Sequence, residues 1–198
     1  MGLDLKYIPG QSPLDDDEKE GLLVDSITTR AELDEFEQMN ITQAVEWTIS
    51  RKFIKDYILS EHFVRELHRR MFNDVWNWAG IFRKSNKNIG VDKTQISTAL
   101  RQLLENSKYW IDHSTYPDDE TAVRIKHGIV NIHCFPNGNG RHSRLMADIV
   151  ITHIFNKPVF TWGQVDLTGY NEARKAYISA IKEADKGNIK PLVEFARS

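Results

Sequence analysis

The stretch that decides the fold is residues 118–155, which read DDETAVRIKHGIVNIHCFPNGNGRHSRLMADIVITHIF. Apolar residues recur at helical spacing over residues 118–132, and residues 141–155 are apolar on several sides, a pattern typical of a buried helix. Gly138 and Gly140 interrupt the pattern between these two segments and permit tight turns of the backbone. The sequence therefore predicts two core helices joined by a glycine-rich turn.

Further helices are predicted on both sides of this pair from the spacing of their apolar residues. Apolar side chains at every fourth position, starting with Phe63 and Leu67, predict a helix over residues 60–75. The other predicted helices span residues 27–58 with a break near 40–42, residues 96–111, residues 169–184 and a short final segment opened by Pro191.

Residues 81–91 break the helical pattern. Two β-prone pieces, Ile81-Phe82-Arg83 and Ile89-Gly90-Val91, flank a polar stretch, and this arrangement predicts a small hairpin. A two-stranded unit is weak by itself, so we expect it to lie as a flap against the helical body. The fold class predicted is therefore all-α with one small β-hairpin flap.

The composition is that of a soluble globular domain. Of the 198 residues, 40% are hydrophobic and 27% are charged, and the formal net charge of -2 gives no basic excess of the kind that nucleic-acid binding needs. Cys134 is the single cysteine, so no intramolecular disulfide can form. Because no apolar run approaches the roughly 18 residues of a membrane span and no signal peptide is visible, we expect a cytoplasmic protein.

The chain divides into three predicted parts. Residues 1–26 are rich in Pro, Gly and Asp and are expected to form an extended N-terminal arm. Residues 27–54 are expected to form N-terminal helices, and residues 55–198 the main domain.

The turn between the two core helices carries residues suited to phosphate. Amides at the start of a helix lack internal partners and the helix dipole favours an anion there, so Gly138–Arg141 predict a phosphate cradle. Arg141 and Arg144 add guanidinium groups, which match phosphate oxygens in a bidentate way. His133 precedes the turn and, with an ordinary pKa of roughly 6.5, can accept a proton from a hydroxyl near neutral pH.

Residues 133–144, HCFPNGNGRHSR, resemble the signature of the Fic family, which is His-x-Phe-x-acid-Gly-Asn-Gly-Arg-x-x-Arg. The fixed positions match in register except the acidic one, where this chain has Asn137. The resemblance extends over residues 55–197, because Fic domains are all-α and carry a hairpin flap before the motif, as residues 78–96 are predicted to do. The whole chain resembles the bacterial group called mobile mystery protein B.

The resemblance implies that AMP moves from ATP to a Ser, Thr or Tyr hydroxyl of a target protein. His133, Asn139 and Arg144 would then be the catalytic residues. His133 would act as general base, and Asn139 with the amides of Gly138–Arg141 would hold the α-phosphate. Arg141 and Arg144 would bind the β- and γ-phosphates, and the flap, through Ile89–Val91, would pair with an extended segment of the target by strand addition.

Asn137 is the departure that bears on a metal ion. Family members usually have Asp or Glu at this position, and that acid holds the magnesium ion that bridges the phosphates. The amide oxygen of Asn137 is a candidate ligand for Mg²⁺ or Mn²⁺, but it lacks the charge of a carboxylate, which lowers the expected metal affinity and rate. Doc-type relatives, which phosphorylate, have Lys where this chain has Gly140, so the motif favours nucleotidyl transfer.

Residues 27–54 carry a candidate inhibitory element. Many Fic proteins are held inactive by a helix bearing Ser/Thr-x-x-x-Glu-Gly/Asn, whose Glu pairs with the second motif arginine. Thr28 and Glu32 match the first two fixed positions of this element, so we expect Glu32 to pair with Arg144. Plain helix capping by Thr28 and Glu32 is the alternative interpretation.

Three other functional interpretations stay open. The protein could transfer another nucleotide or phosphocholine, could have lost catalysis through Asn137, or could be a non-catalytic module that binds a partner peptide. The expected partners are a target protein, an antitoxin and a further copy of the chain, with no nucleic acid or membrane. The flap lysines are explained by solubility, and the histidines have no second cluster of ligands around them to indicate zinc.

Overall fold

The computed structural model describes residues 13–164 and 172–198. The first twelve residues of the predicted arm lie outside the described residues, as does the segment 165–171, where the helix predicted from residue 169 would begin. The helices are α1 (Asp16–Lys19), α2 (Arg30–Ile49), α3 (Lys55–Ile58), α4 (Glu61–Phe72), α5 (Ile96–Asp112), α6 (Asp118–Ile132), α7 (Asn139–His153), α8 (Glu172–Asp185) and α9 (Lys190–Arg197), with short 3-10 turns at Lys93–Gln95 and Trp162–Gln164.

The predicted all-α class is confirmed. Within the described ranges, the β-type pairing consists of an isolated antiparallel bridge between Leu22 and Trp76. In these same ranges, none of the helices is both long and apolar enough to cross a membrane.

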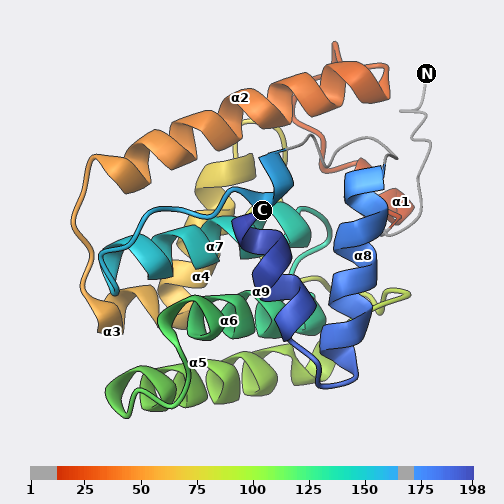
Figure 1. The fold of residues 1–198 in the computed structure, drawn as a ribbon. Helices are drawn as coiled ribbons and strands as arrows, with labels where there is room; N and C mark the ends of the chain where they lie inside the picture. The colour runs from red at the N-terminus through yellow and green to blue at the C-terminus, as the bar shows by residue number, and fades with distance from the viewer. Residues whose placement is uncertain (1–12, 165–171) are drawn as a thin grey trace.

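Helices α6 and α7 form the centre of the fold and pack against each other more extensively than any other pair of described helices. Figure 1 shows them between α2 on one side and α5 on the other. Ile125 and Ile129 of α6 and Met146 and Val150 of α7 are fully buried, in agreement with the apolar pattern of the sequence. Both helices begin and end within two residues of their predicted bounds, so the turn between them is held by the core on both sides.

Helix α2 is continuous, and the break predicted near residues 40–42 is wrong. Asn40, which suggested the break, is buried and ties α2 to the end of α4. Its Nδ2 donates to the carbonyl of Arg70 at 3.0 Å, and its Oδ1 accepts from the amide of Asp74 at 2.9 Å. A polar residue whose hydrogen bonds are satisfied by a neighbouring helix can remain inside its own helix.

Residues 81–91, here called the cover loop, contain no strand, so the predicted hairpin is wrong. The loop folds around the buried side chain of Arg83, which donates to the carbonyls of Ser85, Val91 and His133. Because a guanidinium group bonds to these carbonyls from inside the loop, the two β-prone pieces are held apart and do not form a ladder.

Helices α8 and α9 complete the wall beside α6 and α7, and α8 runs along the flank of the molecule in Figure 1. Gly187, with a φ of 93°, follows α8, and Pro191 lies in the first turn of α9, as the sequence predicts. Helix α9 packs against both α6 and α8 and thereby fixes the position of α8 next to the motif turn.

Candidate active site

A cavity of about 660 Å³ lies over the motif turn. Its walls come from α2, the cover loop, α6, α7 and α8. The predicted site residues that line it are His133, Asn137, Gly138, Asn139, Gly140, Arg141, Arg144, Ile89, Gly90 and Val91. Thr28 and Glu32 are not among the lining residues, so the fold brings together the predicted catalytic, nucleotide and docking residues but not the predicted inhibitory pair.

Two residues with left-handed backbone conformations shape the motif turn. His133 ends α6 with a φ of 56°, and Gly138 precedes α7 with a φ of 75°. A Cβ at Gly138 would lie 2.5 Å from the ring of Phe72. The left-handed φ and this lack of space both favour glycine at the position. The turn therefore places the first residues of α7, whose amides have no partner within the helix, at the cavity that His133 also lines.

The His133 imidazole is buried, with 5% of its surface exposed. Its pKa is lowered to about 4, mainly by burial and also by the positive charges of Arg83 and Lys87, while a hydrogen bond with the backbone of Val130 acts in the opposite direction. At neutral pH the ring is therefore uncharged, which is the state a general base needs.

Asn139 holds the shape of the turn through its side chain. Its Oδ1 accepts from the amide of Phe135 at 3.0 Å, and its Nδ2 donates to the carbonyl of the same residue at 2.8 Å. The side chain is buried with 2% exposure, so both of its polar atoms are used inside the turn. The structure thus gives Asn139 a positioning role, while its backbone amide is among the first amides of α7.

His68 also supports the turn, a role that no pattern in the sequence indicated. Its Nε2 lies 3.0 Å from the carbonyl of Asn137, and its Nδ1 accepts from the amide of Gly80 at 3.0 Å. Its ring stacks on Phe135 with the centroids 3.7 Å apart. Burial holds the pKa of His68 well below its ordinary value, and nearby His142 and Arg141 act in the same direction, so the ring is a neutral bridge between two backbone segments.

Asn137, the predicted metal ligand, uses its side-chain oxygen within the turn. Oδ1 accepts from the amide of Gly138 at 2.6 Å. Among the residues in the described part of the chain, no group of three or more His, Cys, Asp or Glu side chains is placed to hold a metal ion. The donor set therefore does not fit a dedicated protein site for Mg²⁺, which prefers carboxylate oxygens together with water or phosphate oxygens.

The first motif arginine is engaged by α2. A guanidinium nitrogen of Arg141 lies 2.6 Å from Oε2 of Glu37, and the guanidinium also sits 5.0 Å from the centre of the Phe72 ring. The other carboxylate oxygen of Glu37 accepts from Trp76 Nε1 at 2.6 Å. Glu37 is buried on the same stripe of α2 as Leu33, and a charged residue on an apolar stripe is the signal in the sequence that could have identified it.

The second motif arginine lies on the opposite wall. The Arg144 guanidinium sits 5.5 Å from the centre of the Tyr177 ring of α8, and the buried amine of Lys126 lies 4.6 Å from that same centre. Burial raises the pKa of the Tyr177 phenol, but the charges of Lys126 and Arg144 outweigh it and leave this pKa below its ordinary value. Arg174 and Arg30 also line the cavity, and Arg30 pairs at 2.9 Å with Asp34, another lining residue.

Glu32 is a capping residue, and its predicted pairing with Arg144 is wrong. Its Oε2 accepts from the amides of Thr28 and Thr29, each at 2.9 Å, and from the Thr28 hydroxyl at 3.2 Å. The amide of Thr28, followed by that of Thr29, lowers the pKa of Glu32 to about 2. Thr29 and Glu32 form a capping box at the start of α2, so the capping interpretation is confirmed for Glu32, with Thr29 as the N-cap residue in place of Thr28.

Apolar side chains also line the cavity. They come from three elements and are Ile89 of the cover loop, Val130 of α6 and Ile178 and Ile181 of α8. Asp185 lies among them with its carboxylate 2.8 Å from Nε2 of His127. The cavity thus combines charged and apolar lining residues, as ligand pockets commonly do.

Residues 58–151 match the profile of the Fic/DOC family. The matched residues include α4 to α6, the cover loop, the motif turn and most of α7.

Sequence relatives carry the same family name. A protein from Drosophila grimshawi called protein adenylyltransferase Fic is 28% identical over 137 residues, which is 67% of this chain and 26% of the relative. Its counterpart from Drosophila melanogaster is 29% identical over 136 residues, with 67% of this chain and 26% of the relative covered. The chain thus spans about a quarter of the length of these curated relatives.

Solved structures share the fold. Fic-1 from C. elegans superposes with a TM-score of 0.69 at 19% identity, over 90% of this chain and 51% of that one. The Bartonella tribocorum effector BepC, solved with bound AMPPNP, superposes with a TM-score of 0.65 at 17% identity, over 92% of this chain and 97% of that one. At these identities the likeness establishes a Fic-like helical fold.

Proposed function

We propose that the protein is an adenylyltransferase that moves AMP from ATP to a Ser, Thr or Tyr hydroxyl of a target protein. The observation that carries the proposal is that a neutral imidazole, the first amides of α7 and the two motif arginines line one cavity. The names of the sequence relatives support the adenylyl group as the one transferred. The apolar lining residues, among them Val130 and Ile181, have the character needed for contact with a nucleobase.

In the proposed step, His133 takes the proton of the target hydroxyl as the hydroxyl oxygen forms a bond to the α-phosphorus. The bond between the α-phosphorus and the bridging oxygen breaks, and pyrophosphate leaves with the electron pair of that bond. The first amides of α7 stabilise charge on the α-phosphate oxygens, and Arg144 stabilises charge on the leaving group. No step is assigned to a metal ion, because the protein donors around Asn137 do not form a site for one.

We also propose that α2 inhibits nucleotide binding, and that Glu37 is the inhibitory glutamate in place of Glu32. As long as Glu37 holds Arg141, that guanidinium is not available to a phosphate. The expected result of Glu37→Gln is a nucleotide affinity about tenfold higher, because the amide keeps an oxygen for Trp76 but removes the charge that holds Arg141. Isothermal titration calorimetry with a non-hydrolysable ATP analogue measures this affinity.

Two glutamates of the same helix are controls for this substitution. Glu35 is exposed and Glu32 caps the helix, so Glu35→Gln and Glu32→Gln are expected to leave the nucleotide affinity unchanged. An equal gain in all three variants would mean that α2 acts through its net charge and would contradict a specific lock at Arg141.

The docking and partner assignments are also proposals. Ile89 is exposed to 45% and Ile89–Val91 line the cavity, so an extended target segment laid along them would bring its hydroxyl toward His133. Membership of the mobile mystery protein B group and control by an antitoxin rest on the sequence resemblance described above.

The test is incubation with ATP labelled on the α-phosphate, Mg²⁺ or Mn²⁺ and a bacterial lysate as the source of targets, beside a His133→Ala variant. Label on protein that is lost by at least about 100-fold in the variant supports the proposal, because general-base catalysis contributes a factor of this order. Transfer from UTP or GTP but not from ATP would overturn the adenylyl assignment. Nucleotide binding without any transfer would indicate that the protein is a non-catalytic binding module.

A further inference from the structure

Arg83 is a buried arginine in contact with the proposed general base. Its side chain is 3% exposed, although it belongs to a loop that covers a cavity. Nε donates to the carbonyl of His133 at 2.7 Å, one terminal nitrogen donates to the carbonyl of Ser85 at 2.7 Å, and the other donates to the carbonyl of Val91. One planar group therefore joins the base to both halves of the cover loop.

The contact to the His133 carbonyl answers a local need. His133 has a left-handed φ of 56° at the end of α6, so its carbonyl points away from the direction of the helix. A buried carbonyl in that position requires a donor from another element. Arg83 supplies one, and its own amide donates to the next carbonyl, that of Cys134, at 2.9 Å. The backbone of the base is thus held at two successive carbonyls by one residue.

The second half of the cover loop reaches the base through Gly90. A Cβ at Gly90 would lie 2.6 Å from the Cβ of His133 and 3.0 Å from a guanidinium nitrogen of Arg83. The amide of Val91 also donates to the carbonyl of Ile132 at 3.3 Å. The loop, the arginine and the base are therefore in mutual contact, so a change in one is transmitted to the others.

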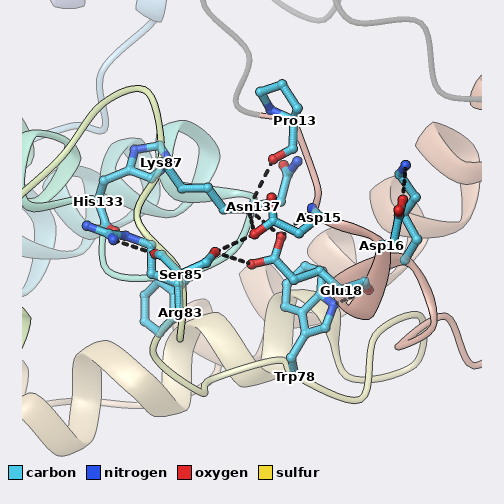
Figure 2. A network of polar contacts seen from close by, with 12 residues as sticks. Pro13, Asp15, Asp16, Glu18, Trp78, Arg83, Ser85, Lys87, His133 and Asn137 are labelled. Atoms are coloured by element: carbon cyan, nitrogen blue, oxygen red, sulfur yellow. Dashed lines mark hydrogen bonds and ion pairs between the residues drawn. The ribbon is translucent and has the colours of Figure 1, made fainter. Parts of the chain in front are cut away.

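The cover loop is anchored from outside by the N-terminal segment. The Lys87 ammonium lies 3.0 Å from the carboxylate of Asp15, pairs with Glu18 and donates to the carbonyl of Pro13, and the Ser85 hydroxyl bonds to Asp15. Figure 2 shows this set of contacts continuing from the N-terminal segment through the loop to Arg83 and His133. The anchors fix the carbonyl of Ser85, and with it one corner of the Arg83 guanidinium.

We propose that Arg83 is a positioning residue for catalysis, which holds His133 in its left-handed conformation so that the imidazole faces the cavity. This inference rests on the proposed function. Arg83 does not line the cavity, whereas Arg141 and Arg144 do. Its loss is therefore expected to lower the rate of the chemical step while leaving nucleotide binding intact.

The experiment compares Arg83→Lys with Arg65→Lys. Lysine keeps the charge but has a single ammonium, which cannot serve three carbonyls set in a plane. Arg65 is the matched control, because its Nε donates to the carbonyl of Gly80 at 3.0 Å beside the same loop without contacting His133. For Arg83→Lys we expect kcat to fall about 100-fold, the effect of misplacing a reacting group by about 1 Å, with KM for ATP within about twofold of the original. Arg65→Lys is expected to change neither.

A second readout does not depend on activity. The carbonyl carbon resonance of His133, observed by NMR with selectively labelled histidine, is expected to shift in Arg83→Lys and in Arg83→Gln but not in Arg65→Lys. An unchanged kcat and an unchanged resonance in Arg83→Lys would overturn the inference. A fall in kcat with a comparable rise in KM, together with shifts throughout the spectrum, would also overturn the inference. That result would show that Arg83 only stabilises the fold.

Failure of the inference and failure of the proposed function give different results. If the unaltered protein transfers label in a His133-dependent way but Arg83→Lys is as fast, only the inference is lost. If the unaltered protein transfers no nucleotide to any target, the proposed function is lost and the positioning role is lost with it.

Discussion

The motif turn and the cover loop face each other across one cavity, but they are held in different ways. The motif turn has a left-handed residue at each end, and its shape is held from within by the bonds between the Asn139 side chain and Phe135. The cover loop has no ladder and is fixed by a guanidinium group at its centre and by ion pairs to the N-terminal segment. Structure held by bonds between residues a few positions apart can be recognised in a short sequence window, whereas structure held by ion pairs to a distant segment cannot.

The largest effect is expected where the two regions touch. Gly90→Ala places a methyl group 2.6 Å from the Cβ of His133, so the base must move and transfer should fall about 100-fold. Gly187→Ala is the matched control, because Gly187 has a similar φ of 93° but open space around its Cβ position. Transfer rates and melting temperatures of the two variants separate displacement of the base from backbone strain. Equal losses of transfer in both would show that strain alone is responsible.

A smaller effect is expected on the motif side. A Cβ at Gly140 meets nothing within 4 Å, and Gly140 lines the cavity at the start of α7. Gly140→Ala should therefore keep or slightly raise the free energy of unfolding, since alanine favours a helix. The methyl group would occupy space that the phosphates need, so nucleotide affinity should fall by about tenfold, which is about 1.4 kcal/mol. Chemical denaturation and titration calorimetry measure the two quantities. An unaltered affinity would place the phosphates elsewhere.

A change of a few-fold is expected at Asn137. Asn137→Asp restores a carboxylate beside the first amides of α7, and carboxylates are the protein ligands that Mg²⁺ prefers. Transfer should rise about threefold and become more steeply dependent on the Mg²⁺ concentration. Asn131→Asp, on α6 at another point of the cavity wall, adds the same charge and serves as the control. A rise in both variants, or in neither, would remove the special role assigned to position 137.

The smallest change is expected on varying the pH near neutrality. Because the pKa of His133 is about 4, its ring stays uncharged from pH 8 down to about pH 6, and the rate should be constant over that range. Protonation of the base then lowers the rate as the pH falls through about 4. The folded protein binds fewer protons at His133 than the unfolded chain between roughly pH 6.5 and 4, so stability also decreases on acidification. Single-turnover rates with circular dichroism at each pH distinguish the two effects. A midpoint near pH 6.5 would indicate an exposed base.

Much of the fold follows from local patterns in the sequence. The bounds of α6 and α7 were predicted within two residues, because apolar periodicity and the glycines are local signals. The residues of the phosphate cradle were predicted for the same reason, since a helix start carries its own amides and dipole. The predicted site residues from His133 to Arg144 do line one cavity.

What could not be predicted depends on side chains that meet across long separations. The contact between Arg83 and the His133 carbonyl joins residues 50 positions apart, and no local pattern indicates it. The choice of Glu37 over Glu32 as the residue that pairs with Arg141 depends on how α2 packs on α4. Motif spacing directed attention to Glu32, whereas the orientation of the helix places Glu37 on its buried side.

The cavity is built partly from segments on either side of the stretch that matches the Fic/DOC profile. Arg30 and Glu37 come before residue 58, and Arg174, Tyr177 and Ile181 come after residue 151. Substitutions in these flanking helices can therefore retune nucleotide choice or restraint while the signature itself stays untouched. Two proteins with identical signatures can differ in what they accept and in how tightly they are restrained, and the flanks are where such a difference would arise.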